Sequence, residues 1–221
     1  MAHQQGQPLR ERDAGSLERL EIERAYFVFD EPAVRAALSK IATHAGEHLF
    51  KVVAFEPASA DMTTMRVRDE GARTTMTIKR ATLESRYLIE DEVTVSDFDA
   101  TVRMLELLGM KKRYYVEKLR DIWRVGSVEV VFDTYPGLPA FIEIEGPSEE
   151  SVASLAEHLG LHEDPLMGAM HMYLQHYGIT TDRPRDDLSF ATAADVLGKY
   201  VTRDRAQFSA MLEAQKARAG D

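Results

Sequence analysis

The sequence contains no cysteine, and this absence removes several kinds of chemistry at once. Disulfide bonds, zinc–thiolate sites and cysteine nucleophiles are all excluded. No apolar run approaches the roughly 18 residues that a membrane span needs, so no membrane partner is expected. The N-terminal residues MAHQQGQPLRERDAG lack the apolar stretch of a secretory signal, and a cytoplasmic protein is therefore the default expectation.

Familiar catalytic and phosphate-binding motifs are missing as well. The sequence has no glycine-rich phosphate loop, no HExxH and no G-x-S-x-G element. Basic residues are in the minority, with 27 Lys and Arg against 37 Asp and Glu, which gives a net charge of −10. This balance argues against a nucleic-acid partner, which needs a basic footprint. A small anionic ligand remains compatible, because a local basic cluster can override the net charge.

The chain length and composition predict one main domain with small additions. The chain has 221 residues, of which 44% are hydrophobic, as in ordinary globular proteins. Residues 1–16 are rich in Gln, Gly and charge, so we expect a flexible tail. Residues 17–180 form the predicted main domain, and residues 181–221 form a predicted helical C-terminal extension. Apolar positions in that extension could pack on the main domain or on a second subunit, as in a homodimer.

Alternating and helical patterns predict an α+β fold dominated by an antiparallel sheet. Strands are expected at residues 20–29, 50–55, 63–69, 73–80, 86–95, 114–125, 127–135 and 140–146. Helices are expected at residues 32–45, 97–108, 148–159 and 164–177, and near 189–201 and 203–218.

Charged residues occupy alternate positions of most of these strands. Because successive strand side chains point to opposite faces, residues at i and i+2 share a face. The pairs are Glu21 and Glu23, Arg66 and Arg68, Thr77 and Lys79, Glu90 and Glu92, Lys118 and Arg120, Glu129 and Asp133, and Glu143 and Glu145. The opposite faces of the same strands are largely apolar.

Two arrangements explain this alternation. For any single strand, an open sheet with one face towards water is the common explanation. Seven consecutive strands with the same pattern, some basic and some acidic, favour a closed sheet with a charged interior. Such an interior would offer carboxylate oxygens to a hard divalent metal and guanidinium and ammonium groups to phosphates.

Several of these pairs match the motifs of a known family. The first strand reads Glu21-Ile22-Glu23-Arg24-Ala25, close to an ExExK signature. The further matches, in order, are Arg66-Val67-Arg68, Thr77-Ile78-Lys79, Glu90-Asp91-Glu92, Lys118-Leu119-Arg120 and Glu143-Ile144-Glu145. In this order and spacing the sequence resembles the CYTH superfamily, also called triphosphate tunnel metalloenzymes. The resemblance extends from about Leu20 to about Tyr177.

The resemblance implies an eight-stranded antiparallel β-barrel, or tunnel, with helices packed outside. It implies that a small-molecule triphosphate binds to Arg66, Arg68, Lys79, Lys118 and Arg120. It also implies that Mg²⁺ or Mn²⁺ binds to Glu21, Glu23, Glu92, Glu143 and Glu145, with Glu90 as an alternative to Glu92. Glu21 and Glu23 would be the catalytic residues. The implied function is a metal-dependent phosphohydrolase that acts on inorganic, nucleoside or thiamine triphosphate.

One position departs from the signature and keeps other functions open. Ala25 stands where the family has lysine, and Arg24 points to the opposite face of the strand. Losing one charge-assisted contact costs about 1.5–3 kcal/mol, so a non-catalytic triphosphate-binding protein is one alternative. A class IV adenylate cyclase, which makes cyclic AMP from ATP, is another. The His-Phe-x-Gly element that tends to precede ExExK in those cyclases is missing here.

Overall fold

The computed structural model describes residues 18–83, 85–162, 168–180 and 187–220. The predicted tail at residues 1–16 lies outside these ranges. The predicted domain boundary falls between residue 180, which is described, and residue 181, which is not. The strands are β1 (Glu18–Glu21), β2 (Glu23–Tyr26), β3 (Thr43–Phe55), β4 (Met62–Asp69), β5 (Thr74–Arg80), β6 (Leu88–Val95), β7 (Lys112–Val125), β8 (Val128–Thr134) and β9 (Phe141–Glu145). The helices are α1 (Glu31–Ile41), α2 (Phe98–Leu107), α3 (Glu149–His158), α4 (Ala169–Tyr177), α5 (Ala193–Leu197), the 3₁₀ turn η1 (Gly198–Tyr200) and α6 (Arg205–Ala219).

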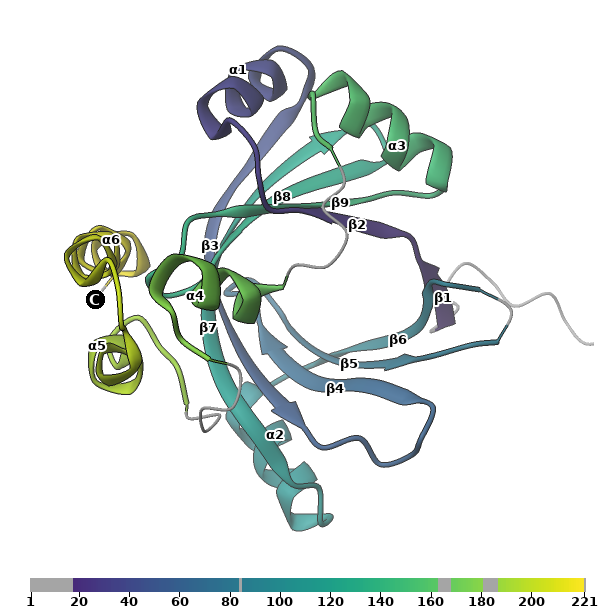
Figure 1. Ribbon diagram of the computed structural model, residues 1–221. Coiled ribbons are helices and arrows are strands. Elements are labelled where there is room, and N and C mark those ends of the chain that lie inside the picture. The colour runs from purple at the N-terminus through teal and green to yellow at the C-terminus, as the bar shows by residue number, and fades with distance from the viewer. Residues whose placement is uncertain (1–17, 84, 163–167, 181–186, 221) are drawn as a thin grey trace, which may run out of the picture.

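All nine strands form one antiparallel sheet in the order β1-β6-β5-β4-β3-β7-β8-β9-β2. The sheet curves so strongly that β8, β9 and β2 lie opposite β4, β5 and β6, with β3 and β7 joining the two sides (Figure 1). This arrangement confirms an α+β fold with a large antiparallel sheet. It also creates an inner face that helices do not cover.

The expected closed barrel of eight strands is not what the structure shows. The predicted first strand, residues 20–29, is two short strands separated at Ile22. β1 pairs with β6 and β2 pairs with β9, so this one segment of chain forms both edges of the sheet. Across the described strands, no pairing joins β1 to β2, and the ladder therefore stays open at this position. The Ile22 carbonyl instead accepts a hydrogen bond from the Gly146 backbone N–H at 3.1 Å.

A second correction concerns the junction between α1 and β3. The Asp30 side chain caps α1 by accepting from the Ala33 N–H at 3.1 Å. The helix ends at Ile41 rather than at residue 45, and β3 begins at Thr43 instead of residue 50. Pairing with β7 explains the difference, because His44 lies opposite Trp123 and their rings are 4.4 Å apart. These cross-strand contacts outweigh the local helical preference of the segment.

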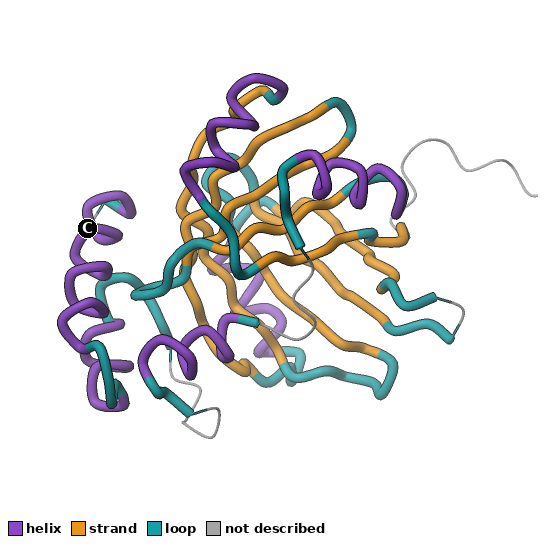
Figure 2. The backbone as a smooth tube through the Cα atoms, turned by 45° about the horizontal axis from the view of Figure 1, so that its top comes forward, coloured by secondary structure: helices purple, strands orange, loops and turns teal. Residues whose placement is uncertain are grey.

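Hydrophobic side chains are gathered in three clusters on the outer face of the sheet. α1 and α3 cover β8, β9 and β2, and α2 covers β3 and β4 (Figures 1 and 2). The described C-terminal helices α4, α5 and α6 form the third cluster with residues of β7 and β9. The helices therefore lie outside the curved sheet, as expected, and the space inside it is left to polar side chains.

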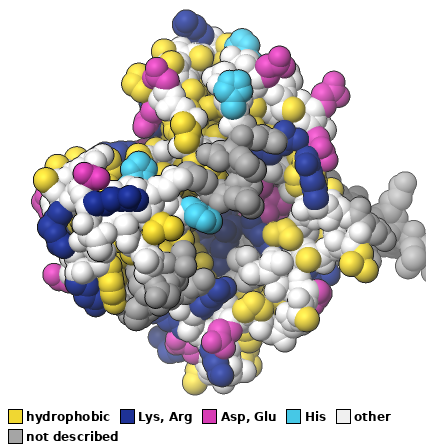
Figure 3. Space-filling view, in the orientation of Figure 1, with side chains coloured by type: hydrophobic (Ala, Val, Ile, Leu, Met, Phe, Trp, Pro, Cys, Tyr) yellow, Lys and Arg dark blue, Asp and Glu magenta, His cyan; other side chains and the backbone are white. Residues whose placement is uncertain are grey.

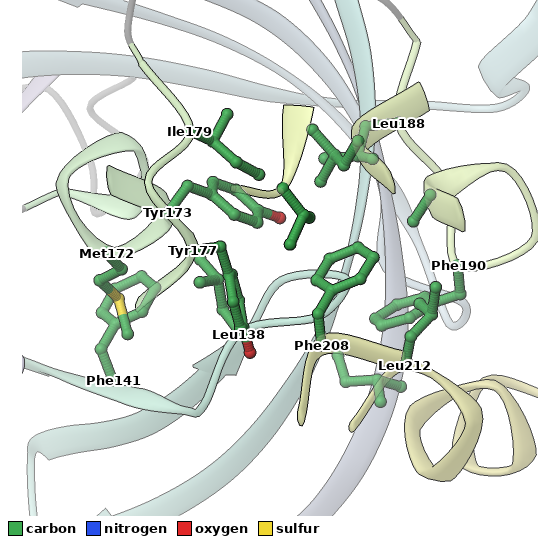
Figure 4. Packing of buried hydrophobic residues seen from close by; sticks show 14 residues of the cluster. Leu138, Phe141, Met172, Tyr173, Tyr177, Ile179, Leu188, Phe190, Phe208 and Leu212 are labelled. Carbon is green, nitrogen blue, oxygen red and sulfur yellow. The ribbon is translucent and has the colours of Figure 1, made fainter. Parts of the chain in front are cut away.

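The described part of the C-terminal extension is helical and packs against the turn between β8 and β9. Phe208 and Leu212 of α6 pack near Leu138 of this turn (Figure 4). The Gln215 side chain accepts from the Gly137 N–H at 2.6 Å and donates to the Leu138 carbonyl at 2.7 Å. Gly137 has φ of 81°, and a Cβ there would overlap the Phe208 ring, so glycine is required. The extension thereby supports the two strands that flank the site described next.

Candidate functional site

The inner face of the curved sheet encloses a cavity of about 200 Å³, here called the lumen. Figure 3 shows the corresponding hollow, with basic and acidic side chains inside it. Its lining residues are Glu21, Glu23, Arg66, Arg68, Arg73, Lys79, Glu90, Glu92, Lys118, Arg120, Glu129, Val131, Tyr135, Glu143 and Glu145. All ten residues that the sequence predicted for the site are in this set. The structure thus brings them together, although their roles remain predictions.

The strand alternation places these side chains, and the register aligns them across neighbouring strands. Arg66 of β4 lies opposite Thr77 of β5, and Thr77 lies opposite Glu92 of β6. The Thr77 hydroxyl donates to a Glu92 carboxylate oxygen at 3.0 Å. By the same alternation Arg24 points outward, where its guanidinium lies 3.9 Å from Glu149 of α3. The outer position of Arg24 is therefore confirmed.

Four of the basic side chains that line the lumen are here called the cationic region: Arg66, Arg68, Lys118 and Arg120. The Lys118 ammonium donates to Asp133 at 2.5 Å, and Arg120 donates to both Asp133 oxygens at 2.7 and 2.5 Å. Asp133 is fully buried. Burial alone would raise the pKa of Asp133, but Arg120 and Lys118 outweigh it and hold that pKa well below its usual range.

For Lys118, by contrast with Asp133, the effect of burial outweighs that of the ion pair. Burial, together with the neighbouring charge of Arg120, lowers the pKa of Lys118 to about 8, despite its contact with Asp133. Arg120 stays charged and also donates to Glu143 at 2.6 Å. Asp133 therefore holds two buried cations in fixed positions, and both of these side chains line the lumen.

Two further arginines have donors with no partner among the described residues. The Nε atoms of Arg66 and Arg68 are buried and make no hydrogen bond within the described residues. The same holds for the hydroxyl group of Thr75. Thr75 lies directly opposite Arg68 on the neighbouring strand. Burial, then the like charge of Arg66, lowers the pKa of Arg68, which signals crowded positive charge. Unsatisfied buried donors are costly and call for an explanation.

Four carboxylates, Glu21, Glu23, Glu143 and Glu145, form the carboxylate region. Glu23 of β2 lies directly opposite Glu145 of β9, and Ala25 lies opposite Glu143. Burial and then the charge of Glu143 raise the pKa of Glu23. Like charges directly opposite each other destabilise a sheet, so this arrangement favours a bound cation.

Lys79 connects the carboxylate region to the neighbouring strands. Its ammonium lies 2.5 Å from Glu21, 3.7 Å from Glu90 and 3.9 Å from Glu23. Burial nevertheless raises the pKa of Glu21 to about 7, since the opposing effect of Lys79 is smaller. Glu21 can therefore accept a proton near neutral pH.

The carboxylate region has the right chemistry for a hard divalent cation but not a finished coordination shell. Mg²⁺ and Mn²⁺ prefer oxygen ligands, and four carboxylates on adjoining strand ends provide them. No group of three or more His, Asp or Glu side chains is already arranged around a metal position within the described residues. Glu21 and Glu143 are instead directed at Lys79 and Arg120. The residues present fit such an ion if these ion pairs exchange partners.

Several lining residues were not assigned to the site from the sequence. Arg73 comes from the turn between β4 and β5, where its side chain pairs with Glu70 at 2.8 Å. Tyr135 follows β8, and its ring stacks on Phe141 with centroids 6.0 Å apart. Both positions nevertheless fall within expected strands, residues 73–80 and 127–135, and on the same faces as Lys79 and Asp133, so the strand pattern did give a signal. Glu129 and Asp133 did show the alternation, and the face they share was the available signal.

Comparison with known proteins identifies relatives of this arrangement. Residues 19–168 match the family profile described as CYTH domain. Three solved structures share the fold. The PH1012 protein from Pyrococcus horikoshii OT3 has a TM-score of 0.57 at 22% identity, covering 66% of this chain and 96% of that one. A proposed adenylate cyclase from Vibrio parahaemolyticus has a TM-score of 0.59 at 17% identity, covering 70% and 97%. Another from Bacillus halodurans has a TM-score of 0.51 at 18% identity, covering 70% and 97%.

No curated protein matches the sequence. Within the described residues, none of the helices combines the length and the apolar character needed to cross a membrane.

Proposed function

Because the chain belongs to the CYTH domain family, we propose that it is a metal-dependent phosphohydrolase whose lumen binds a triphosphate: inorganic, nucleoside or thiamine triphosphate. One observation carries the proposal. The buried donors Arg66 Nε, Arg68 Nε and Thr75 Oγ1 have no partner among the described residues. Arg66 and Arg68 line the same lumen as Lys118 and Arg120, and a polyanion rich in acceptor oxygens satisfies such donors.

Binding would proceed by exchange of ion pairs across the lumen. Arg120 is paired with Glu143 at 2.6 Å, Arg68 with Glu92 at 3.3 Å, and Lys79 with Glu21 at 2.5 Å. In each pair, a basic side chain proposed to bind phosphate is held by a carboxylate. Phosphate oxygens would take the place of the carboxylates on the basic side chains. The released carboxylates would then be available to a cation, so the two ligands would favour each other's binding.

The chemical step depends on positioning and charge neutralisation, as in phosphoryl transfer generally. When bound, Mg²⁺ or Mn²⁺ would neutralise phosphate charge and polarise the phosphoryl oxygens. Glu21 and Glu23 are the proposed catalytic residues, because a carboxylate with a raised pKa can take a proton from an attacking water. The basic side chains would hold the leaving phosphates and stabilise their charge.

The test is a product screen on the full chain with Mg²⁺, Mn²⁺ or EDTA. Tripolyphosphate, ATP and thiamine triphosphate are supplied in turn, and phosphate, pyrophosphate and cyclic AMP are all measured. Metal-dependent phosphate release that is lost in Glu23→Gln supports the proposal. The matched control is Glu157→Gln on the exposed face of α3, which should behave like the parent. Absence of phosphate release from every triphosphate contradicts a hydrolase.

A cyclase is the second candidate function. Within the carboxylate region Glu21 is buried but the side chain of Glu23 is 38% exposed, against 8% for the side chain of Lys118 in the cationic region. A nucleotide whose terminal phosphate lies in the cationic region would place its α-phosphate among the carboxylates. Attack by the 3′-hydroxyl there would release pyrophosphate and cyclic AMP, which the same screen detects.

A third candidate is binding without turnover. Ala25, which lies opposite Glu143, takes the position of the signature lysine, so the lumen lacks that ammonium group. In that case the screen would give no product, while triphosphate would still protect the protein against heat.

A further inference from the structure

A second cavity, of about 370 Å³, lies beside the lumen and shares two residues with it. Its lining residues are Glu21, Glu23, Arg24, Arg86, Tyr87 and Leu88. Leu88 begins β6 and lies directly opposite Glu21, so it marks the end of the inner face at this side of the sheet. Arg86 and Tyr87 come immediately before it. The second cavity therefore adjoins the lumen at Glu21 and Glu23, before the start of β6, and extends to Arg24 on the outer side of β2; it is here called the vestibule.

Tyr87 gives this vestibule an aromatic wall that is held in place. The Arg86 guanidinium lies 4.8 Å from the Tyr87 ring centroid and donates to its hydroxyl at 2.7 Å. The same guanidinium donates to Glu149 of α3 at 2.8 Å, and Ser85 Oγ accepts from the Tyr87 N–H at 3.0 Å. A half-buried ring fixed at both ends is a suitable surface for stacking another ring.

The charge distribution of the lumen sets the direction of a bound triphosphate. None of the four side chains of the cationic region lines the vestibule, whereas Glu21 and Glu23 line both spaces. The terminal phosphates carry most of the negative charge, so they would lie in the cationic region. The other end of the chain, where an ester group is attached, would then point towards the vestibule.

We infer that the vestibule at Tyr87 is a binding subsite for the heteroaromatic group of an esterified triphosphate. The inference rests on the proposed triphosphate site. The vestibule has two acidic and two basic residues in its lining, which suits a ring of low net charge with polar edges. The Tyr87 ring supplies stacking, and Arg86 holds that ring.

A third cavity, of about 570 Å³, also adjoins the lumen and provides the natural comparison. It shares Arg73, Glu129 and Glu145 with the lumen and is bordered by Arg124, Gly126 and Pro147. Its described lining contains no aromatic ring. Its arginines could contact an ester group by charge or hydrogen bonds but offer no stacking surface of the kind Tyr87 does. Arg124→Ala is therefore the matched control.

The experiment compares Tyr87→Ala, Tyr87→Phe and Arg124→Ala with the parent as full chains. Binding of ATP, thiamine triphosphate and tripolyphosphate is measured by calorimetry in EDTA, and kcat/KM is measured with Mn²⁺. In Tyr87→Ala we expect affinity for at least one organic triphosphate to fall on the order of 10-fold, with tripolyphosphate unchanged. Tyr87→Phe should retain parental affinity because the ring remains, and Arg124→Ala should not discriminate between the ligands.

Each result is decisive. Selective loss for ATP alone identifies a nucleoside group, and selective loss for thiamine triphosphate alone identifies a thiamine-type group. Equal loss for all three ligands, no loss for any, or selectivity in Arg124→Ala instead of Tyr87→Ala overturns the inference. In each of these three cases the parent still binds tripolyphosphate, so the proposed function stands while the subsite is rejected. If the parent itself does not bind tripolyphosphate, the proposed function fails and the subsite fails with it.

Discussion

The cationic and carboxylate regions face the same lumen but differ in how their charges are balanced. In the cationic region, Lys118 and Arg120 share the fully buried Asp133, and their own side chains are 8% and 13% exposed. In the carboxylate region, Glu23 and Glu145 lie directly opposite each other, and the Glu23 side chain is 38% exposed. One region carries an internal counter-ion, and the other consists of like charges partly open to water.

This difference indicates which region is preorganised. Asp133 keeps the cations in place before any ligand arrives, so phosphate would meet donors already aimed at it. The carboxylates are held apart by repulsion or drawn towards Lys79 and Arg120, so their final geometry would depend on a cation. Five predictions test this contrast, in order of decreasing expected effect.

The largest effect on stability is expected from neutralising Asp133, the counter-ion of the cationic region. Asp133→Asn keeps the shape but leaves two buried cations without their carboxylate, so the free energy of unfolding should fall by about 3–5 kcal/mol. Asp91→Asn is the matched control, because Asp91 pairs with Arg80 in a partly exposed bridge worth about 0–1 kcal/mol. Urea unfolding measures both. Equal losses in the two variants would show that Asp133 has no special role.

The second prediction concerns pH. The pKa of Glu21 is raised to about 7 in the folded protein, mainly by burial, from an ordinary value of 4.5. A raised carboxylate pKa means that this contribution to stability is fully present below pH 4.5 and is lost as pH rises through 7. The loss is on the order of 3 kcal/mol. In EDTA, Glu21→Gln should flatten this part of the pH–stability curve; an unchanged slope in the variant would contradict the assignment.

The third prediction tests the metal. Glu143→Gln combined with Glu145→Gln should abolish the thermal stabilisation that Mn²⁺ gives the parent. At a concentration 100 times Kd, that stabilisation would be about 2.7 kcal/mol. Glu157→Gln, on the exposed face of α3, should retain the full melting shift. A melting shift that survives in the double variant would place the cation elsewhere.

The fourth prediction compares the two faces of the sheet. Arg66→Ala removes a lumen cation and should weaken tripolyphosphate binding by about 1.5–3 kcal/mol. Arg24→Ala removes an outward arginine near Glu149 and should leave that binding nearly unchanged. Calorimetry in EDTA measures both. Comparable losses would mean that strand alternation does not separate the lumen from the outer face.

The fifth prediction concerns the missing lysine. Ala25 lies opposite Glu143, so Ala25→Lys would add an ammonium group at the junction of the two regions. A transition-state contact worth about 2 kcal/mol corresponds to roughly 30-fold in turnover. Ala25→Leu adds volume without charge and serves as the control. If lysine gives no gain on any triphosphate while binding stays tight, the protein is better described as a binder than as a hydrolase.

Strand alternation predicted which charged side chains share the inner face of the sheet. Charges at i and i+2, as in Lys118 and Arg120 or Glu143 and Glu145, depend only on side chains pointing to opposite faces of a strand. That rule holds whether a sheet is open or closed. The ten predicted site residues therefore line one cavity, although the observed ladder has nine strands and is not closed.

Features set by tertiary contacts could not be predicted in this way. The register between His44 and Trp123 extends β3 into a segment whose local pattern favours helix. Arg73 was expected to begin a strand at residues 73–80, but it lies in the turn before β5 (Thr74–Arg80) and still lines the lumen. The break at Ile22 follows from the different partners of β1 and β2, which the sequence of one strand does not reveal.

The division of the first strand between β1 and β2 has a consequence for the order of folding. β2 leaves the ribosome early, but its partner β9 (Phe141–Glu145) is made only after most of the sheet has been synthesised. β1 can pair with β6 as soon as that strand is made, but until β9 follows, β2 has no partner and one edge of the growing sheet stays unpaired. Pairings so distant along the chain close slowly and leave strand edges exposed to other chains. We therefore expect the pairing of β2 with β9 to be among the last to form in the sheet, after β1 has joined β6.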